Sequence, residues 1–530
     1  MSRTSLVWII AIISLAGLSA PQPSSAQSKQ LGKVHFATSC KPEAQKLFDR
    51  AMLYQHSFWY RASKQAFDDV IKSDPDCAIA YWGIAQSLLL NPFSPPPKAN
   101  LPEGLAAIEK ARSIGAKTER ERDFIEALGA FYTDHDKVDH RPRVQAFVKA
   151  MEGVAERNRK DDEAQIFYAL ALNVGASPGD KTYANQLKAA EILEKIFKSQ
   201  PQHPGVAHYL IHTYDYPPIA AKGLAAAKRY SKIAPAAPHA QHMPGHIFTR
   251  VGYWKDSIAS NTESARVAKL DKEPDDQLHG SDYLVYAHLQ LAQDKKARAV
   301  IDEMLAVENF KRNAGHYGRA ASEARYMVER GDWKGAAELQ VRPSEFAYVD
   351  AITHFARALG AARSGNVDTA RADLDKLIEL RDKLRQARDT YWAEQVDIQW
   401  QIANAWVLHA EGKHEDALKA LALAAEAEDK TEKHPITPGP LAPARELYGI
   451  MLLDRGIPQE ALAAFEATLK KEPNRLATYV GAAKAAKRAG ALTKAKQFTA
   501  KVVALTRDGD TKRPEVSELA SKTAAAAAVR

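Results

Sequence analysis

Cysteine is almost absent from this sequence. Only Cys40 and Cys77 occur among the 530 residues, and neither belongs to a Cys-x-x-Cys pair or a Cys-x-x-Cys-His sequence. A thioredoxin-like redox motif and covalent haem attachment are therefore excluded.

Long apolar runs are also scarce. The one near the N-terminus extends from Leu6 to Leu18, which is shorter than the ~20 residues of a transmembrane helix. Arg3 precedes this run, and small residues ending at Ala26 follow it, as signal peptidase requires. Residues 1–26 are thus predicted to be a signal peptide, with an uncleaved anchor as the alternative. We expect a periplasmic or secreted protein without a transmembrane segment after cleavage.

Runs of Lys and Arg are missing, although the formal net charge is +8. Acidic residues are interspersed with the basic ones, which indicates solvated helix surfaces and no nucleic-acid partner. The sequence also has no Gly-x-Ser-x-Gly, no His-Glu-x-x-His, no phosphate loop and no dinucleotide fingerprint. No catalytic residue is predicted, and whether the protein is an enzyme stays open.

Alternating β-branched runs, the mark of strands, are nearly absent. Apolar residues instead recur at i, i+3, i+4 and i+7, as in residues 44–54 and 461–469. Pro, Gly, Asn and Asp separate these segments, for example at residues 73–76. The predicted fold class is all-α.

A 34-residue recurrence is clearest near the C-terminus. Small residues, a glycine, an alanine, an aromatic residue and a proline follow the spacing of the tetratricopeptide repeat (TPR), at Gly449, Gly456, Ala461, Phe465 and Pro473. Ala483, Gly490 and Ala495 repeat part of the pattern 34 residues later. The small residues let the two helices of a repeat cross closely. The sequence therefore predicts a TPR-type α-solenoid of helix-turn-helix repeats.

Proline-rich stretches suggest how this solenoid is divided. Four prolines lie between Asp429 and Pro443. We expect a repeat array over residues 27–428, a linker over 429–443, a C-terminal TPR pair over 444–510 and a tail over 511–530. Another interruption of the array is expected at residues 91–102.

Histidine is the residue that departs most from an even distribution. Six of the 17 histidines lie between residues 203 and 246. His208 and His212 are four residues apart, and His242 and His246 repeat this spacing 34 residues later. Residues at i and i+4 share one helix face about 5–6 Å apart. Two such pairs on neighbouring helices can bring four imidazoles to one point.

The TPR register places further polar residues beside these four. It assigns the histidines to the first helix of two adjacent repeats, on the concave groove. The additional groove residues on this register are His239, His279, Asp215, Asp282 and Tyr286. We expect His239 or His279 to complete or flank a shared metal site, and Asp215 or Asp282 to orient a ligand histidine.

Imidazole ligands without thiolates suit zinc, copper, nickel or iron. Pro244 lies inside the expected second helix, where an interior proline kinks the chain, and such a departure from local rules indicates a functional place. A solvent-open groove would leave a coordination position free for catalysis. Two alternatives stay open: the histidines hydrogen-bond a peptide or protein partner in the groove, or they are structural.

These stretches resemble a group of exported bacterial TPR proteins. The resemblance is carried by His203-Pro204-Gly205 with the following Val-Ala-His-Tyr-Leu-Ile-His, and by the run from Pro238 to Phe248, which contains His-Met-Pro-Gly-His-Ile-Phe. It implies the fold and the site but supplies no reaction. TPR resemblance in general implies binding of a protein or peptide in the concave groove.

The two cysteines are predicted to form a disulfide. Cys40 precedes the first helix of one repeat and Cys77 precedes that of the next. Equivalent points of stacked repeats are neighbours, and an exported protein meets oxidising conditions.

Overall fold

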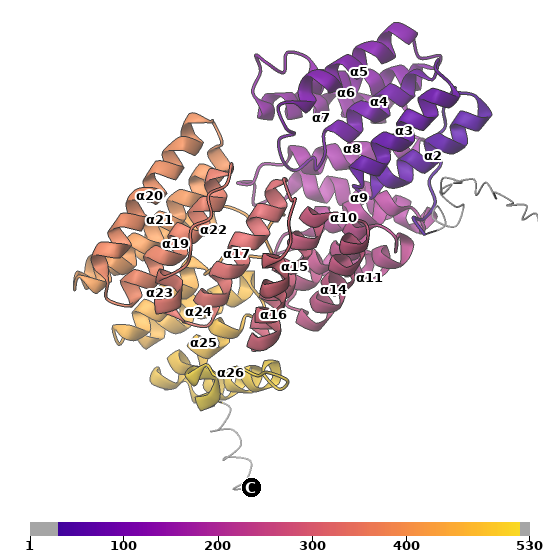
Figure 1. The fold of residues 1–530 in the computed structure, drawn as a ribbon. Coiled ribbons are helices and arrows are strands. Elements are labelled where there is room, and N and C mark those ends of the chain that lie inside the picture. The colour runs from indigo at the N-terminus through magenta and orange to yellow at the C-terminus, as the bar shows by residue number, and fades with distance from the viewer. Residues whose placement is uncertain (1–29, 520–530) are drawn as a thin grey trace, which may run out of the picture.

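The regular elements of the chain are all helices in the computed structural model, which describes residues 30–519 (Figure 1). No strand occurs within that range, and none of its helices is long and apolar enough to cross a membrane. The predicted signal peptide lies outside the described residues.

The N-terminal half of the described chain is a succession of antiparallel helix pairs. Its helices are α2 (Pro42–His56), α3 (Tyr60–Ser73), α4 (Ala78–Leu88), α5 (Asn100–Ile114), α6 (Glu119–Tyr132), α7 (His140–Arg157), α8 (Asp162–Gly175), α9 (Ala184–Ser199), α10 (Pro204–Tyr214), the 3-10 turn η1 (Ala220–Gly223), α11 (Leu224–Ile233), α12 (Pro238–His242), α13 (Pro244–Arg250) and α14 (Trp254–Leu270). The short helices α12 and α13 together form the first arm of one pair.

The same plan continues to the C-terminus. The helices are α15 (Pro274–Gln290), α16 (Asp294–Leu305), α17 (Asn313–Glu329), α18 (Trp333–Ala337), α19 (Ala347–Arg363), α20 (Val367–Gln386), α21 (Thr390–Ala410), α22 (His414–Asp429), α23 (Ala444–Asp454), α24 (Pro458–Lys471), α25 (Leu476–Arg488) and α26 (Leu492–Leu505). Each helix packs against the next along the chain.

Small residues set how closely the paired helices cross. A Cβ atom added at Gly83 would lie 2.4 Å from the ring of Phe67, and one added at Gly481 would lie 2.4 Å from the ring of Phe465. Glycine therefore lets an aromatic side chain of the neighbouring helix fill the crossing point. These crossings and the repeated helix pairs confirm the predicted all-α TPR-type solenoid.

The C-terminal repeats fold back onto the middle of the chain. Trp254 Nε1 donates a hydrogen bond of 2.8 Å to the carbonyl oxygen of Asn474, and Ala292 shares an apolar cluster with Leu476 and Val480. In Figure 1, α25 and α26 lie below α16 at the end of the array. The C-terminal end of the solenoid thus contacts helices α14 and α15 in its middle.

The tail is partly anchored as well. Arg513 is buried and forms an ion pair of 2.6 Å with Asp294. Its guanidinium also donates to the carbonyl oxygen of Leu289. Residues 511–519 therefore pack on α15 and α16, and residues 520–530 lie outside the described range.

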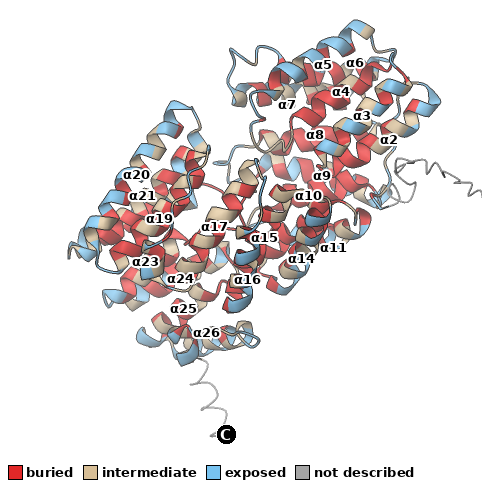
Figure 2. Ribbon diagram, viewed as in Figure 1, coloured by how far each residue is buried: buried red, intermediate tan, exposed pale blue. Residues whose placement is uncertain are grey.

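Burial is greatest where the site lies. Every residue of α10 is buried, and the ribbons of α8 and α10 are largely red in Figure 2, whereas the outer ends of α20 are exposed. Residues 430–443, which connect α22 to α23, form no helix. Ile436, Thr437, Leu441 and Ala442 of this connection are nevertheless buried. We call residues 430–443 the strap.

Candidate metal centre

Six imidazoles gather where α10, α12, α13 and α15 meet. The six are His208, His212, His239, His242, His246 and His279. Five of these side chains are at most 9% exposed, and His239 is partly exposed. We call this cluster of six histidines the imidazole chamber. Apolar neighbours and repeat packing bury the histidines, so their polar atoms need partners inside the protein.

The first group in the chamber is His208, His212 and His239. Their potential ligand atoms lie within 4.8 Å of one another. The Nε2 atoms of His208 and His212 are 3.1 Å apart, as the i, i+4 spacing on one helix allows. His239 joins them from the following repeat. We call these three residues the first trio.

The second group repeats this arrangement one repeat later. His242, His246 and His279 also place their potential ligand atoms within 4.8 Å of one another. The Nε2 atoms of His242 and His246 are 2.9 Å apart. The helix breaks between them at Met243, because Pro244 begins α13. We call these residues the second trio.

The grouping differs from the single shared centre expected from the sequence. Each i, i+4 pair combines with one histidine from the start of the next repeat, His239 for the first pair and His279 for the second. The stagger between successive repeats brings the beginning of one first helix beside the middle of the preceding one. His239 and His279 therefore belong to separate trios.

The outer nitrogens of three histidines are held by other parts of the chain. His208 Nδ1 lies 2.7 Å from the backbone oxygen of His56, and His242 Nδ1 lies 2.6 Å from Asn261 Oδ1. His246 Nδ1 lies 2.8 Å from Asp215 Oδ2. Each oxygen accepts the Nδ1 proton, which leaves the lone pair on Nε2. This is how outer partners commonly orient histidine ligands of a metal.

The other three histidines have buried nitrogens without a hydrogen-bond partner. These atoms are His212 Nδ1, His239 Nε2 and His279 Nδ1. A buried polar atom without a partner costs about 1–3 kcal/mol. Convergent lone pairs together with orphaned imidazole nitrogens fit a transition metal, which takes neutral imidazole as a ligand.

Two residues expected beside the histidines face elsewhere. Asp282 lies 3.5 Å from Arg325 Nε and accepts from Ser322 of α17. The hydroxyl group of Tyr286 lies 3.2 Å from Arg475 Nη1. Tyr286 is two turns beyond His279, about 10 Å along α15, and Asp282 turns toward α17. Of the expected carboxylates, Asp215 alone contacts a chamber histidine through a hydrogen bond within the described residues.

The strap covers the second trio. The hydroxyl of Tyr283 contacts His246 Nδ1 at 3.3 Å and donates to the backbone oxygens of Pro435 and Thr437, both at 3.2 Å. Lys433 Nζ, itself buried, lies 3.2 Å from Asp215 Oδ2. The expectation of a solvent-open groove is therefore wrong at this point, because a segment of the same chain lies over the imidazoles.

Aromatic rings cover the first trio. The ring of Phe93 stacks on His212 with centroids 4.5 Å apart, and Phe58 contacts His208 at 4.3 Å. Phe58 has φ of 52°, a left-handed conformation that favours glycine. Such strain is held in place by surrounding structure and concentrates at functional sites. Sequence reasoning missed both phenylalanines, although Phe58 stands at the turn position where other repeats carry glycine.

Burial sets the protonation of the chamber. It lowers the pKa of His208 to about 3 and holds the pKa of His212, His239, His242 and His279 well below the ordinary value. Burial also lowers the pKa of His246, although Asp215 opposes this effect. The imidazoles are thus neutral at pH 7, as metal ligation requires.

Buried charged groups beside the second trio shift one another's pKa values. Burial disfavours the ionised form of Asp215, but Lys433, Arg250 and His246 overcome this effect and hold its pKa well below the usual range. Burial and the nearby Arg250 lower the pKa of Lys433 to about 8. Arg250 also binds Asp215, with Nε 2.9 Å from Oδ1. Asp215 thus stays a carboxylate that can accept the His246 proton.

Comparison with known proteins yields structural likeness only. No protein-family model and no curated protein sequence matches the chain. Among solved structures, the human IFIT1 dimer with m7Gppp-AAAA is 11% identical, with 91% of this chain and 99% of that chain covered and a TM-score of 0.33. Yeast Tom70 is 13% identical, with 92% and 96% covered and a TM-score of 0.30. Cut9 in complex with Hcn1 is 11% identical, with 91% and 96% covered and a TM-score of 0.29. The fold assignment rests on the helix pairs described above.

A third cluster of metal-ligand residue types lies next to the chamber. His56 Nε2 and His203 Nε2 bind the two oxygens of Glu163 at 3.0 and 2.9 Å. His56 Nδ1 contacts the Tyr209 hydroxyl at 3.0 Å, and His203 Nδ1 accepts from the Val206 backbone. Both rings are fully partnered, so this cluster is a hydrogen-bonded network that holds α2, α8 and α10 together.

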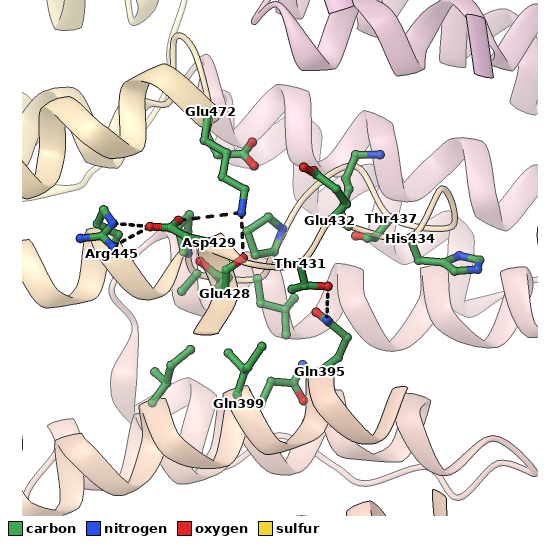
Figure 3. A pocket seen from close by; sticks show the side chains of 18 of the residues that line it. Gln395, Gln399, Glu428, Asp429, Thr431, Glu432, His434, Thr437, Arg445 and Glu472 are labelled. Carbon is green, nitrogen blue, oxygen red and sulfur yellow. Dashed lines mark hydrogen bonds and ion pairs between the residues drawn. The ribbon is translucent and has the colours of Figure 1, made fainter. Parts of the chain in front are cut away.

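The strap also borders a small cavity, shown in Figure 3. Its walls include Gln395 and Gln399 of α21, together with Glu428, Glu432 and Glu472. In Figure 3, Gln395 reaches Thr431 of the strap, and His434 points away from Glu428. Burial raises the pKa of Glu428 to about 7. The cavity is lined by residues of the strap and by none of the six chamber histidines.

The two cysteines lie where the repeat positions suggested. Cys40 and Cys77 are joined as a disulfide with their Cα atoms 5.0 Å apart. The bond ties the segment before α2 to the start of α4. Nearby, the backbone N–H of Lys41 donates to Asp74 Oδ2 at 2.9 Å.

Proposed function

We propose that this protein is an exported TPR-type protein that binds a transition metal through the buried imidazole chamber. The observation that carries the proposal is the state of the ring nitrogens. His208, His242 and His246 have their outer nitrogens held by oxygen acceptors. Three further histidines carry buried nitrogens without a partner. A metal ion would bind the inward Nε2 atoms, which in each i, i+4 pair contact one another at 3.1 and 2.9 Å.

Zinc, copper, nickel and iron all accept imidazole nitrogen as a ligand. Asp215 would raise the basicity of His246 as a ligand, and Asn261 would hold the ring of His242 in place. Three protein ligands leave a coordination position for water or a small molecule, as in catalytic sites. We therefore extend the proposal to metal-dependent chemistry, with the substrate left open.

Metal analysis tests this proposal directly. We expect near-stoichiometric transition metal in protein purified without chelator and measured by inductively coupled plasma mass spectrometry. The double variant His208→Ala/His242→Ala removes one imidazole from each trio and should lose most of the metal. The matched control is His354→Ala, because His354 of α19 is bonded to Asp373 at 2.7 Å, and Arg357 still binds that carboxylate in the variant. Metal content unchanged in the double variant would overturn the proposal.

The alternative is a peptide-binding or protein-binding scaffold of the periplasm or cell surface without a metal. The helical-repeat fold supports this alternative, whereas the strap speaks against a peptide lying on the chamber itself. Pro435 and Thr437 already accept the Tyr283 hydroxyl there. Purified protein that holds no metal, and takes up none from solution, would favour the scaffold function.

A further inference from the structure

We propose that the imidazole chamber holds two copper ions side by side, one in each histidine trio, joined by a shared bridging ligand. This inference rests on the metal-binding function proposed above. It adds the number of ions, their arrangement and the identity of the metal.

The size of each trio suits one ion. Three atoms that all lie within 4.8 Å of one another have a common centre no more than about 2.8 Å from each, close to the ~2.0–2.1 Å of a zinc–imidazole bond. The Nε2 atoms of the i, i+4 pairs are 3.1 and 2.9 Å apart. Two nitrogens on one ion at right or tetrahedral angles lie about 2.9–3.4 Å apart at that bond length. Small ring rotations are enough to complete each trio.

The two trios are neighbours. The ring centroids of His212 and His246, one from each trio, are 5.9 Å apart. Those of His239 and His242 are 6.0 Å apart. Two-metal sites hold their ions about 3.5–4 Å apart. Rings of opposite trios are therefore adjacent, an arrangement compatible with two ions that share one oxygen ligand.

A single ion cannot use all six rings. His208 and His279 are held at opposite ends of the chamber, His208 by the backbone of His56 and against Tyr230. His279 contacts His242 at 4.3 Å instead. One shared ion would leave buried nitrogens of at least one trio without a partner, at the cost noted above. Two ions give the converging nitrogens of each trio a common partner.

The charge around the chamber favours copper. Asp215, Glu432 and Glu472 face Arg250, Lys433 and Lys181, so the nearby side-chain charges balance. The six imidazoles add no negative charge. Each buried divalent ion would thus carry two uncompensated charges, which is costly in a poorly solvated site. Copper can enter as the monovalent ion, which halves that charge, and divalent copper heads the affinity order for nitrogen ligands.

Copper loading combined with electron paramagnetic resonance tests the inference. Chelator-treated protein is loaded anaerobically with Cu(I), freed of excess by gel filtration, and oxidised with ferricyanide, which takes one electron from each copper. The product is analysed for copper per chain and for integrated spin. We expect two copper ions per chain and an integrated signal well below two spins, because ions joined by a bridging ligand couple antiferromagnetically. Two copper ions with two full spins would overturn the shared bridge.

Half-site variants locate the two ions. His208→Gln/His212→Gln should retain one copper with a full one-spin signal, and His242→Gln/His246→Gln should do the same. Glutamine at position 246 can still donate to Asp215. If either double variant fails to fold by circular dichroism, the single variants His239→Phe and His279→Phe replace it. Each of these should lower the affinity of one copper at least tenfold and leave the other unchanged.

The outcomes separate this inference from the proposed function. One copper per chain in the unmodified protein, lost in both half-site variants, would show a single shared centre. That result would support metal binding and refute the paired site. No binding of copper, zinc, nickel or iron would remove the proposed function itself. The variant His203→Gln, in the partnered cluster, should keep two copper ions and their coupled signal.

Discussion

Acid should loosen the imidazole chamber of the metal-free protein over a defined pH range. Burial lowers the pKa of His208 to about 3, whereas an unfolded histidine titrates near 6.5. Below pH 6.5 the unfolded chain therefore binds a proton at this histidine and the folded chain does not, so the free energy of unfolding falls. Above pH 6.5 neither state binds the proton, and this contribution to stability is fully present.

The magnitude follows from this difference in proton binding. At pH 5.5 His208 alone contributes a loss of about 1.4 kcal/mol relative to pH 8. Burial also holds the pKa of His212, His239, His242 and His279 well below the ordinary value. Each of these groups adds a loss of the same sign to that of His208. For His208 the loss continues down to about pH 3.

Hydrogen exchange read by mass spectrometry is the suitable assay, because repeat proteins open locally and a single unfolding free energy is poorly defined. In chelator-treated protein, peptides from α10 and α13 should lose protection at least tenfold between pH 7.5 and 5.5, after correction for intrinsic exchange. Peptides from α25 and α26, which contain no histidine, serve as the internal control. The variant His208→Gln should reduce the pH dependence by about one proton. Equal protection of α10 at both pH values would refute the reasoning.

Three further predictions concern the rest of the chain. Replacing Cys40 and Cys77 with Ser removes a cross-link between residues with a sequence separation of 37, and should lower the free energy of unfolding by about 4 kcal/mol. The urea midpoint should fall, and an unchanged midpoint would contradict this prediction. Gly83→Ala should lower the melting temperature, because the new Cβ would lie 2.4 Å from the Phe67 ring and overpacking costs about 1–3 kcal/mol. The control Gly153→Ala meets only the end of a flexible arginine and should be neutral or stabilising. Mass spectrometry of the protein from its native host should find an N-terminus near Gln27, and a mature chain that keeps Met1 would rule out cleavage of the signal peptide.

Local periodicity was sufficient to predict the fold. The 3.6-residue period of apolar side chains and the 34-residue recurrence depend on neighbours in sequence. A helix such as α24, with a glycine before it and a proline after it, could therefore be predicted from the sequence. The same local geometry places His208 beside His212, and His242 beside His246, because i and i+4 lie on one helix face. The shared position of Cys40 and Cys77 before successive repeats is likewise a property of the repeat.

The chemistry of the chamber depended on tertiary structure. The division into two trios follows from the stagger between repeats, which spacing along one helix does not contain. Asp282 and Asp215 looked equivalent on the register, but Arg325 of α17 engages the first while the second binds His246. The strap reaches Tyr283 from about 150 residues away in sequence, because the C-terminal repeats fold back onto the middle of the array. Closure of that kind depends on contacts between distant segments, and no local pattern in the sequence records them.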